Sequence, residues 1–438
     1  MKYQPVIGLE VHVELKTDSK MFCACSADHF AKKPNTQVCP VCLGLPGALP
    51  VPNEKAIEWT QKLGAALGCK LAIDSQFDRK HYFYPDLPKG YQISQYQHPL
   101  AEGGKFQSVN ITRVHLEEDT GKLMHQKVGD KNVSLIDFNR SGVPLVEIVT
   151  DPDFSSASGA KSFARDLQQT VRHLGVSDAD MEKGSMRLEA NISVGDKSQA
   201  TSDKLPNYKV ELKNINSFRF MEAAINYEIE RQEKVLENGE SLIQETRGYD
   251  EKTKITKPQR TKEEAQDYRY FPEPDIPPLS FSNTQLEKVK SGVSELPQGK
   301  RESLVAEHKI PEMYAAVLTR TEELSDYFSE AVKIGDKHGL VAKKIADFLV
   351  NKKTDIKKVS PEGLVKMIKG DGEKSSLSDK HLEKAVEDVV GKNKGAVADY
   401  KAGKEVALKF LVGQVMAKTK GQANPRKVQD LLSKKLNE

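Results

Sequence analysis

The sequence of 438 residues has no hydrophobic run of the length that a bilayer span requires, and it contains one tryptophan and five cysteines. The missing run excludes an ordinary transmembrane helix. The first residues, MKYQPVIGLE, lead into a strand-like pattern without the apolar stretch of a signal peptide. We therefore expect a cytoplasmic protein that does not bind membranes.

Familiar nucleotide-binding and hydrolytic motifs are also missing. The sequence has no Walker A motif, no kinase-type glycine loop in a suitable strand context and no G-x-S-x-G elbow. If the protein uses ATP, it must bind the nucleotide in a site of another kind.

Charge is distributed unevenly along the chain, which is long enough for two or three domains. Residues 331–438 hold 24 Lys and Arg against 14 Asp and Glu, a net charge of +10, whereas residues 1–330 hold 42 against 49, a net charge of −7. An acidic body with a basic tail predicts carboxylate chemistry in the first part and a polyanionic partner for the second. A solvated, lysine-rich helical surface is the alternative for the tail.

Four cysteines lie close together as C-x-C followed by C-x-x-C, at Cys23, Cys25, Cys39 and Cys42. In a reducing compartment, such pairs bind metal more often than they form disulfides. Four thiolates suit one tetrahedral Zn(II), although a vestigial site and a redox pair are alternatives. The fifth, Cys69, is expected to be a small buried residue.

The hydrophobic pattern predicts a mixed α+β fold. Strand-like segments fill residues 1–150 and return near 186–194 and 208–218, without a regular alternation of strand and helix, so we expect a mainly antiparallel sheet. The pattern predicts helices over 54–68, 155–174 and 219–238, a proline-broken border over 268–281, and only helices from about 284 onward. In the last pair of helices, Gly421 follows the first, while Asn424 and Pro425 fit the start of the second.

The strand-like segment VIGLEVHVEL, residues 6–15, alternates in an unusual way. Its apolar residues share one face, and Glu10, His12 and Glu14 share the other with Gly8. A solvated face of an antiparallel sheet is the default explanation. A metal or phosphate site is the alternative.

Further acids favour the metal site when they are taken together, although each one alone is more simply explained as an ordinary surface or ion-paired residue. Glu147 stands alone in the apolar run PLVEIVT, where an unpaired carboxylate is costly. Glu117, Glu118 and Asp119 are adjacent, so they repel one another unless cations join them. Glu118 shares the face of Val114 and Leu116 and is expected to point inward. Carboxylates with one imidazole suit Mg(II) or Mn(II).

Several long segments resemble the B subunit of the aspartyl/glutamyl-tRNA amidotransferase, the GatB family. They extend from residue 3 to residue 430 and are rich in unusual combinations of residues. They read VIGLEVHVELKT, CPVCLGLPGALPV, FDRKHYFYPDLPKGYQISQ, RVHLEEDTGK, DFNRSGVPLVEIV, VELKNINSFRF, QETRGYDEKT, DYRYFPEPDIPPL and FLVGQVMAKTKGQANP.

The resemblance implies a ligase subunit that uses ATP and Mg(II). In that family the B subunit phosphorylates the side-chain carboxylate of Glu or Asp mischarged on tRNA(Gln) or tRNA(Asn). An amidase A subunit supplies ammonia from glutamine, ammonia displaces the phosphate, and a small C subunit completes the complex. Whether Glu-tRNA(Gln), Asp-tRNA(Asn) or both are substrates stays open. The runner-up is a non-catalytic, zinc-containing scaffold that binds tRNA.

The resemblance also implies site residues and domains. The family's magnesium ligands fall on His12, Glu118 and Glu147, with Glu10 close by, and its structural zinc ligands fall on the four clustered cysteines. The domains are a catalytic cradle domain over 1–283, a helical linker domain over 284–370 that is shorter than the family's, and a YqeY-like helical tail over 371–438. Independently of the resemblance, basic side chains flank the sequence GQANP, where the start of a helix offers backbone N–H groups to a phosphate. We therefore expect the tail to contact tRNA through Lys418, Lys420, Arg426 and Lys427.

One loop offers further contacts. The segment DLPKGYQISQ contains Lys89, Tyr91 and Gln95, which suit phosphate or other substrate groups. A purely structural loop explains the same residues equally well.

Overall fold

The computed structural model describes residues 3–196, 205–261, 268–293, 295–352, 354–373, 379–419, 423 and 425–437. Its contacts divide the chain into two compact units. The first comprises Met1–Glu302 and Thr319–Glu322, and the second comprises Ser303–Leu318 and Glu323–Glu438.

A nine-stranded sheet forms the centre of the first unit, and every neighbouring pair in it is antiparallel except β12 and β13. The α+β class with a mainly antiparallel sheet is therefore confirmed. In spatial order the strands are β14 (Ile255–Thr261), β13 (Glu245–Asp250), β12 (Val210–Ile215), β11 (Met186–Asp196), β1 (Tyr3–Glu14), β10 (Pro144–Thr150), β7 (Val109–Glu118), β6 (Ala101–Phe106) and β2 (Lys70–Leu71).

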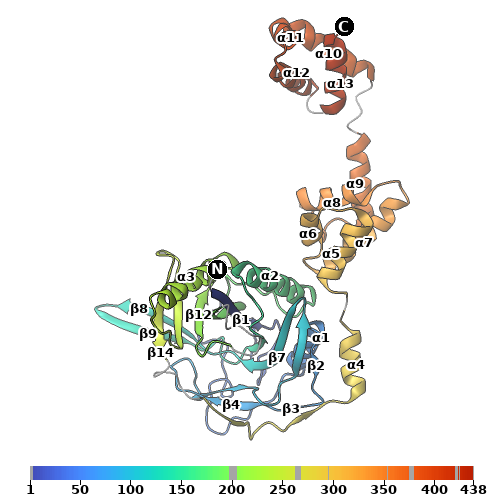
Figure 1. Ribbon diagram of the computed structural model, residues 1–438. Coiled ribbons are helices and arrows are strands. Elements are labelled where there is room, and N and C mark those ends of the chain that lie inside the picture. The colour runs from blue at the N-terminus through green and yellow to red at the C-terminus, as the bar shows by residue number, and fades with distance from the viewer. Residues whose placement is uncertain are drawn as a thin grey trace. The chain divides into compact units, whose positions relative to one another are not determined.

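The apolar face of this sheet is covered by three helices, α1 (Glu54–Ala66), α2 (Ala157–His173) and α3 (Phe218–Glu237). In Figure 1, α2 and α3 lie side by side near β1 and β12. The residues that the alternation assigned to the core are buried, from Ile7 on β1 to Leu15 directly after it. The side chains of Asn53, Ser156 and Ser217 accept backbone N–H groups at the three helix starts, close to the predicted boundaries.

A three-stranded sheet in the order β15 (Arg269–Pro272), β4 (Asp78–His81) and β5 (Tyr91–Ser94) adjoins the large one. It contains part of the predicted proline-broken border. Arg79 on β4 makes two hydrogen bonds, of 2.7 and 2.8 Å, to the buried carboxylate of Glu273. These bonds hold β15 beside β4 although the two strands are far apart in the sequence.

Short elements complete the first unit. They are β3 (Asp74–Ser75) with β16 (Leu279–Ser280), the hairpin of β8 (Lys122–Val128) and β9 (Lys131–Asp137), and α4 (Asn283–Ser291), which packs against α1.

The rest of the described chain is helical and has two separate apolar cores. The first core draws on α5 (Pro297–His308), α6 (Glu312–Leu318), α7 (Glu322–Asp336), α8 (Ala342–Asn351) and α9 (Pro361–Glu373). The second draws on α10 (Asp379–Lys392), α11 (Lys394–Lys401), α12 (Glu405–Lys418) and α13 (Pro425–Asn437). Within the described residues, no helix combines the length and apolar character of a membrane span. The predictions for Gly421 and Asn424 fall outside the described residues.

Candidate functional site

The polar face of β1 meets polar residues of both neighbouring strands. His12 lies opposite Glu147 of β10 and Arg187 of β11, and Glu147 in turn lies opposite His115 of β7. Because residues directly opposite in a sheet share a face, this register gathers two imidazoles and a carboxylate. Glu117, two residues after His115, points to the same side.

These side chains form a compact, largely buried cluster of His12, Glu117 and Glu147, whose ligand atoms lie within 4.8 Å of one another. The Nε2 atom of His12 is 3.4 Å from Glu147 Oε2 and 3.8 Å from Glu117 Oε1. His115 Nε2 is 3.1 Å from Glu147 Oε2, and Ser94 donates to Glu117 Oε2 at 3.0 Å. Two carboxylates and one imidazole are the donors that suit Mg(II).

A positive charge stabilises the buried carboxylates of this cluster. Burial alone would lower the pKa of His12, but Glu147 and its neighbours outweigh burial and raise that pKa to about 9. Burial would raise the pKa of Glu147, yet His115 and His12 hold it well below its usual value. A proton on His12 thus balances the carboxylates here, and a bound divalent cation would replace that proton.

The three adjacent acids each face different partners. Glu117 faces His12 and His115. Glu118 lies 2.5 Å from Lys89 Nζ and accepts from Ile93 N at 2.9 Å. Asp119 pairs with Arg187 at 2.6 Å. The expectation that Glu118 points inward is confirmed, because it is 2% exposed. Because Glu118 points to the opposite face of β7 from His12, Glu117 joins the cluster instead of Glu118.

Glu10 belongs to a neighbouring cluster with Glu189 and Glu211. Its carboxylate accepts from Asn191 at 2.8 Å, and Lys213 lies 3.2 Å from Glu189 and 3.4 Å from Glu211. The structure therefore does not group Glu10 with His12, although both lie on the same face of β1.

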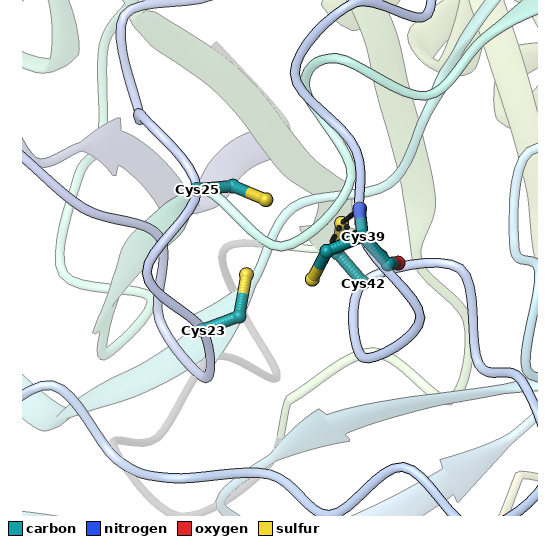
Figure 2. Close-up of side chains that lie close together, drawn as sticks. All are labelled: Cys23, Cys25, Cys39 and Cys42. Atoms are coloured by element: carbon teal, nitrogen blue, oxygen red, sulfur yellow. Dashed lines mark hydrogen bonds between the residues drawn. The ribbon is translucent and has the colours of Figure 1, made fainter.

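The four clustered cysteines converge. Figure 2 shows Cys23 and Cys25 on one loop and Cys39 and Cys42 on another, with their sulfur atoms turned toward a shared centre. All four sulfur atoms lie within 4.8 Å of one another, and none of the four cysteines is in a disulfide. This cluster could hold a metal such as zinc. Cys69 is buried, as the sequence predicts.

A buried lysine lies beside the four cysteines and favours the thiolate form of one of them. Lys20 is fully buried, and its ammonium group contacts Gln37 O at 2.8 Å, Phe138 O at 3.3 Å and Cys42 Sγ at 3.6 Å. A buried ammonium needs an anion, and a thiolate at Cys42 supplies one. The hydrogen bond with Cys23, the backbone N–H of Cys39 and the charge of Lys20 together lower the pKa of Cys42 to about 4 despite burial.

The loop residues proposed as substrate contacts separate into two groups. Lys89 and Tyr91 line a cavity of about 220 Å³ beside Cys42 and Glu118. Gln95 is buried; its amide donates to Ser75 Oγ at 2.7 Å and accepts from Leu116 N at 3.1 Å. Protein contacts thus use both ends of the Gln95 amide.

The structure describes only part of the predicted tRNA-binding group. Lys418 pairs with the exposed Asp388, and Lys427 is exposed. Lys420 lies outside the described residues, and the side chain of Arg426 is not described.

Reasoning from the sequence missed His115 as a neighbour of the cluster. The signal was the alternation in RVHLEED, where His115 and Glu117 share a face, but the alternation alone did not say which face met Glu147. Only the pairing of β7 with β10 decides this.

The amino-acid sequence of the chain matches a class of catalytic domains. Residues 5–287 match the family model described as the GatB/GatE catalytic domain, and residues 338–436 match that of the GatB domain. The chain belongs to the GatB family.

Curated relatives agree over the full length. The chain is 45% identical to the B subunit of the aspartyl/glutamyl-tRNA(Asn/Gln) amidotransferase of Thermotoga maritima, with 100% of this chain and 99% of the relative covered. It is 44% identical to the B subunit of the same name from Thermodesulfovibrio yellowstonii, with 100% of both chains covered. These alignments span 483 positions, so the relatives carry residues that have no counterpart among the 438 here.

Proposed function

We propose that this chain is the subunit of a tRNA-dependent amidotransferase that activates the side-chain carboxylate of Glu or Asp mischarged on tRNA. A carboxylate oxygen attacks the γ-phosphorus of ATP, and the bond to the ADP oxygen breaks. Ammonia then attacks the resulting acyl phosphate, loses a proton and expels phosphate, which leaves the amide. The names and full-length similarity of the relatives support this proposal.

We place the reaction centre at the cluster of His12, Glu117 and Glu147. We propose it as the Mg(II) site, with Glu117 in place of Glu118 and with Glu10 outside the first set of ligands. Mg(II) held there would screen the repulsion between the ATP phosphates and the substrate carboxylate. Ser94 and His115 orient the two carboxylates through the contacts described above.

The remaining parts of the proposal follow the family. A glutaminase A subunit supplies ammonia, a small C subunit completes the complex, and the reaction takes place in the cytoplasm. The four cysteines hold a structural zinc ion. Lys89 and Tyr91 keep their proposed role as substrate contacts, and the basic tail binds the body of the tRNA.

The adjacent pair Glu117 and Glu118 provides a matched test. Glu117→Gln and Glu147→Gln should each weaken Mn(II) binding, measured by electron paramagnetic resonance on the full chain, by about tenfold or more, because each removes a charged ligand. Glu118→Gln should change it by less than about twofold, since its oxygens serve Lys89 and Ile93. The reverse ranking would restore Glu118 as the ligand.

The activity of the complete complex tests the proposed phosphorylation and amidation. In the complete complex with ATP and mischarged tRNA, Glu117→Gln should abolish release of ADP while the partner's basal glutaminase activity survives. A complex with Glu117→Gln or Glu147→Gln that still releases ADP and forms the amide at the wild-type rate would favour the non-catalytic scaffold.

A further inference from the structure

A group of tyrosines stands at the side of the carboxylate cluster without a role in the steps above. We call Tyr82, Tyr96, Tyr268 and Tyr270 the tyrosine shelf. Tyr96 and Tyr270 stack with ring centroids 4.5 Å apart and planes 18° apart, and Tyr82 meets Tyr268 edge-on at 5.6 Å. The four residues come from segments almost 190 positions apart.

The shelf is partly open to solvent. Tyr96 is 51% exposed and Tyr268 is 39% exposed. Stacked rings that stay exposed to this degree are costly in water but ready to accept another flat ring. Such rings are the usual platform for a nucleic-acid base.

The shelf is held rigidly. The backbone N–H of Tyr96 donates to Asp78 Oδ2 at 2.9 Å, and Tyr270 pairs with Lys80 in the register of β15 and β4. The bidentate contact between Arg79 and Glu273 fixes those two strands together. A platform ordered in advance loses little entropy when a ring binds.

The shelf lies beside the proposed reaction centre. Ser94, which donates to Glu117, precedes Tyr96 by two residues, so the chain between them spans at most about 7 Å. Lys80 Nζ lies 4.9 Å from the ring centre of Tyr268, and its charge acts on Glu117 and Glu147 as well. The tyrosine rings, the ammonium group of Lys80 and the carboxylate cluster therefore lie next to one another along this side of the site.

We infer that the tyrosine shelf binds an adenine ring, an inference that rests on the proposed function. An adenosine whose base stacks on Tyr96 would direct its phosphates or its 3′ end toward Lys80 and the carboxylate cluster. The reaction contains two such adenosines, namely that of ATP and the terminal adenosine of the charged tRNA. The shared chemistry is a purine base joined to an anionic group.

Binding measurements on the full chain separate the two sources. Tyr96→Leu, which removes the ring, should weaken binding about tenfold, whereas Tyr96→Phe, which keeps it, should stay within about twofold. If the base belongs to ATP, Tyr96→Leu weakens ATP binding but not tripolyphosphate binding. If it belongs to tRNA, the variant loses the preference for tRNA ending in CCA over tRNA ending in CC. Phe83→Ala, which removes an 82% exposed ring outside the shelf, is the matched control.

The outcomes distinguish this inference from the proposed function. A folded Tyr96→Leu protein that keeps both the ATP affinity and the preference for CCA would overturn the shelf, and Tyr270→Leu would repeat the test independently. A wild-type chain that binds neither ATP nor tRNA would contradict the shelf and the proposed reaction together.

Discussion

At the scale of single residues, neighbours in the sequence have opposite surroundings. Glu117 faces two histidines, and Glu118 faces Lys89, because successive residues of a strand project to opposite sides. The same rule explains why Glu10 and His12, two positions apart, share a face. Their distance along β1 then separates them into different clusters.

Cys69 differs from the other cysteines, and we predict that thiol reactivity reveals this. Burial raises the pKa of the Cys69 thiol to about 12 from the usual value near 9. At pH 8, the metal-loaded chain should show no rapidly reacting thiol, a strong chelator should release four, and Cys69 should react only after unfolding. Ellman's reagent together with zinc analysis measures this. Four fast thiols in a chain that retains one zinc would contradict it.

The same pKa has a consequence for stability. Since the folded thiol holds its proton more tightly than the unfolded one, its contribution is fully present below pH 9 and is lost as the pH rises toward 12. The unfolding free energy of Cys69→Ala should therefore fall less steeply between pH 9 and pH 12 than that of the wild-type chain.

At the scale of elements, the loop that carries Cys39 and Cys42 is tied to the small sheet. Gly44 has φ +65°, and a Cβ there would stand 2.3 Å from Lys89 Cγ. Gly47, three residues on, has φ +82° with open space around it. The positive φ favours glycine at both positions, but only Gly44 also lacks the space for a Cβ atom.

This difference predicts unequal costs for two alanine substitutions. Gly47→Ala should cost about 1 kcal/mol through backbone strain alone. Gly44→Ala should cost about 2 kcal/mol more, because it displaces Lys89 and disturbs its pair with Glu118. Urea unfolding followed by the fluorescence of Trp59, in α1 of the first unit, measures both. Equal costs would show that Lys89 moves aside freely.

At the scale of the whole molecule, the basic part of the chain has two apolar cores. A cut at residue 331 would fall inside α7 and remove Ala331 and Val332 from the first of them. A cut after Glu373 removes only the second core with its helices α10 to α13. That segment, residues 374–438, holds 14 Lys and Arg against 8 Asp and Glu, a net charge of +6.

We predict that removal of residues 374–438 weakens tRNA binding and flattens its salt dependence. Each lost phosphate contact should lower the slope of log K against log salt by about 0.9. Filter binding at several salt concentrations measures the slope, and Mn(II) binding by the first unit should stay unchanged as a control. An equal slope with and without the segment would show that these lysines only solvate the helices.

The sequence alone determined features that depend on local order. Alternation in VIGLEVHVEL separated the core face from the polar face, Gly68 marked the end of a helix, and the cysteine spacing predicted that four thiols lie close enough together to hold a metal, because these signals lie within a few residues or one loop. Tertiary structure decided which acids meet. The choice between Glu117 and Glu118 depended on how β7 pairs with β10, and the tyrosine shelf required β4 and β15 to lie together. No pattern within one segment carries that information, since it arises only when distant strands pair.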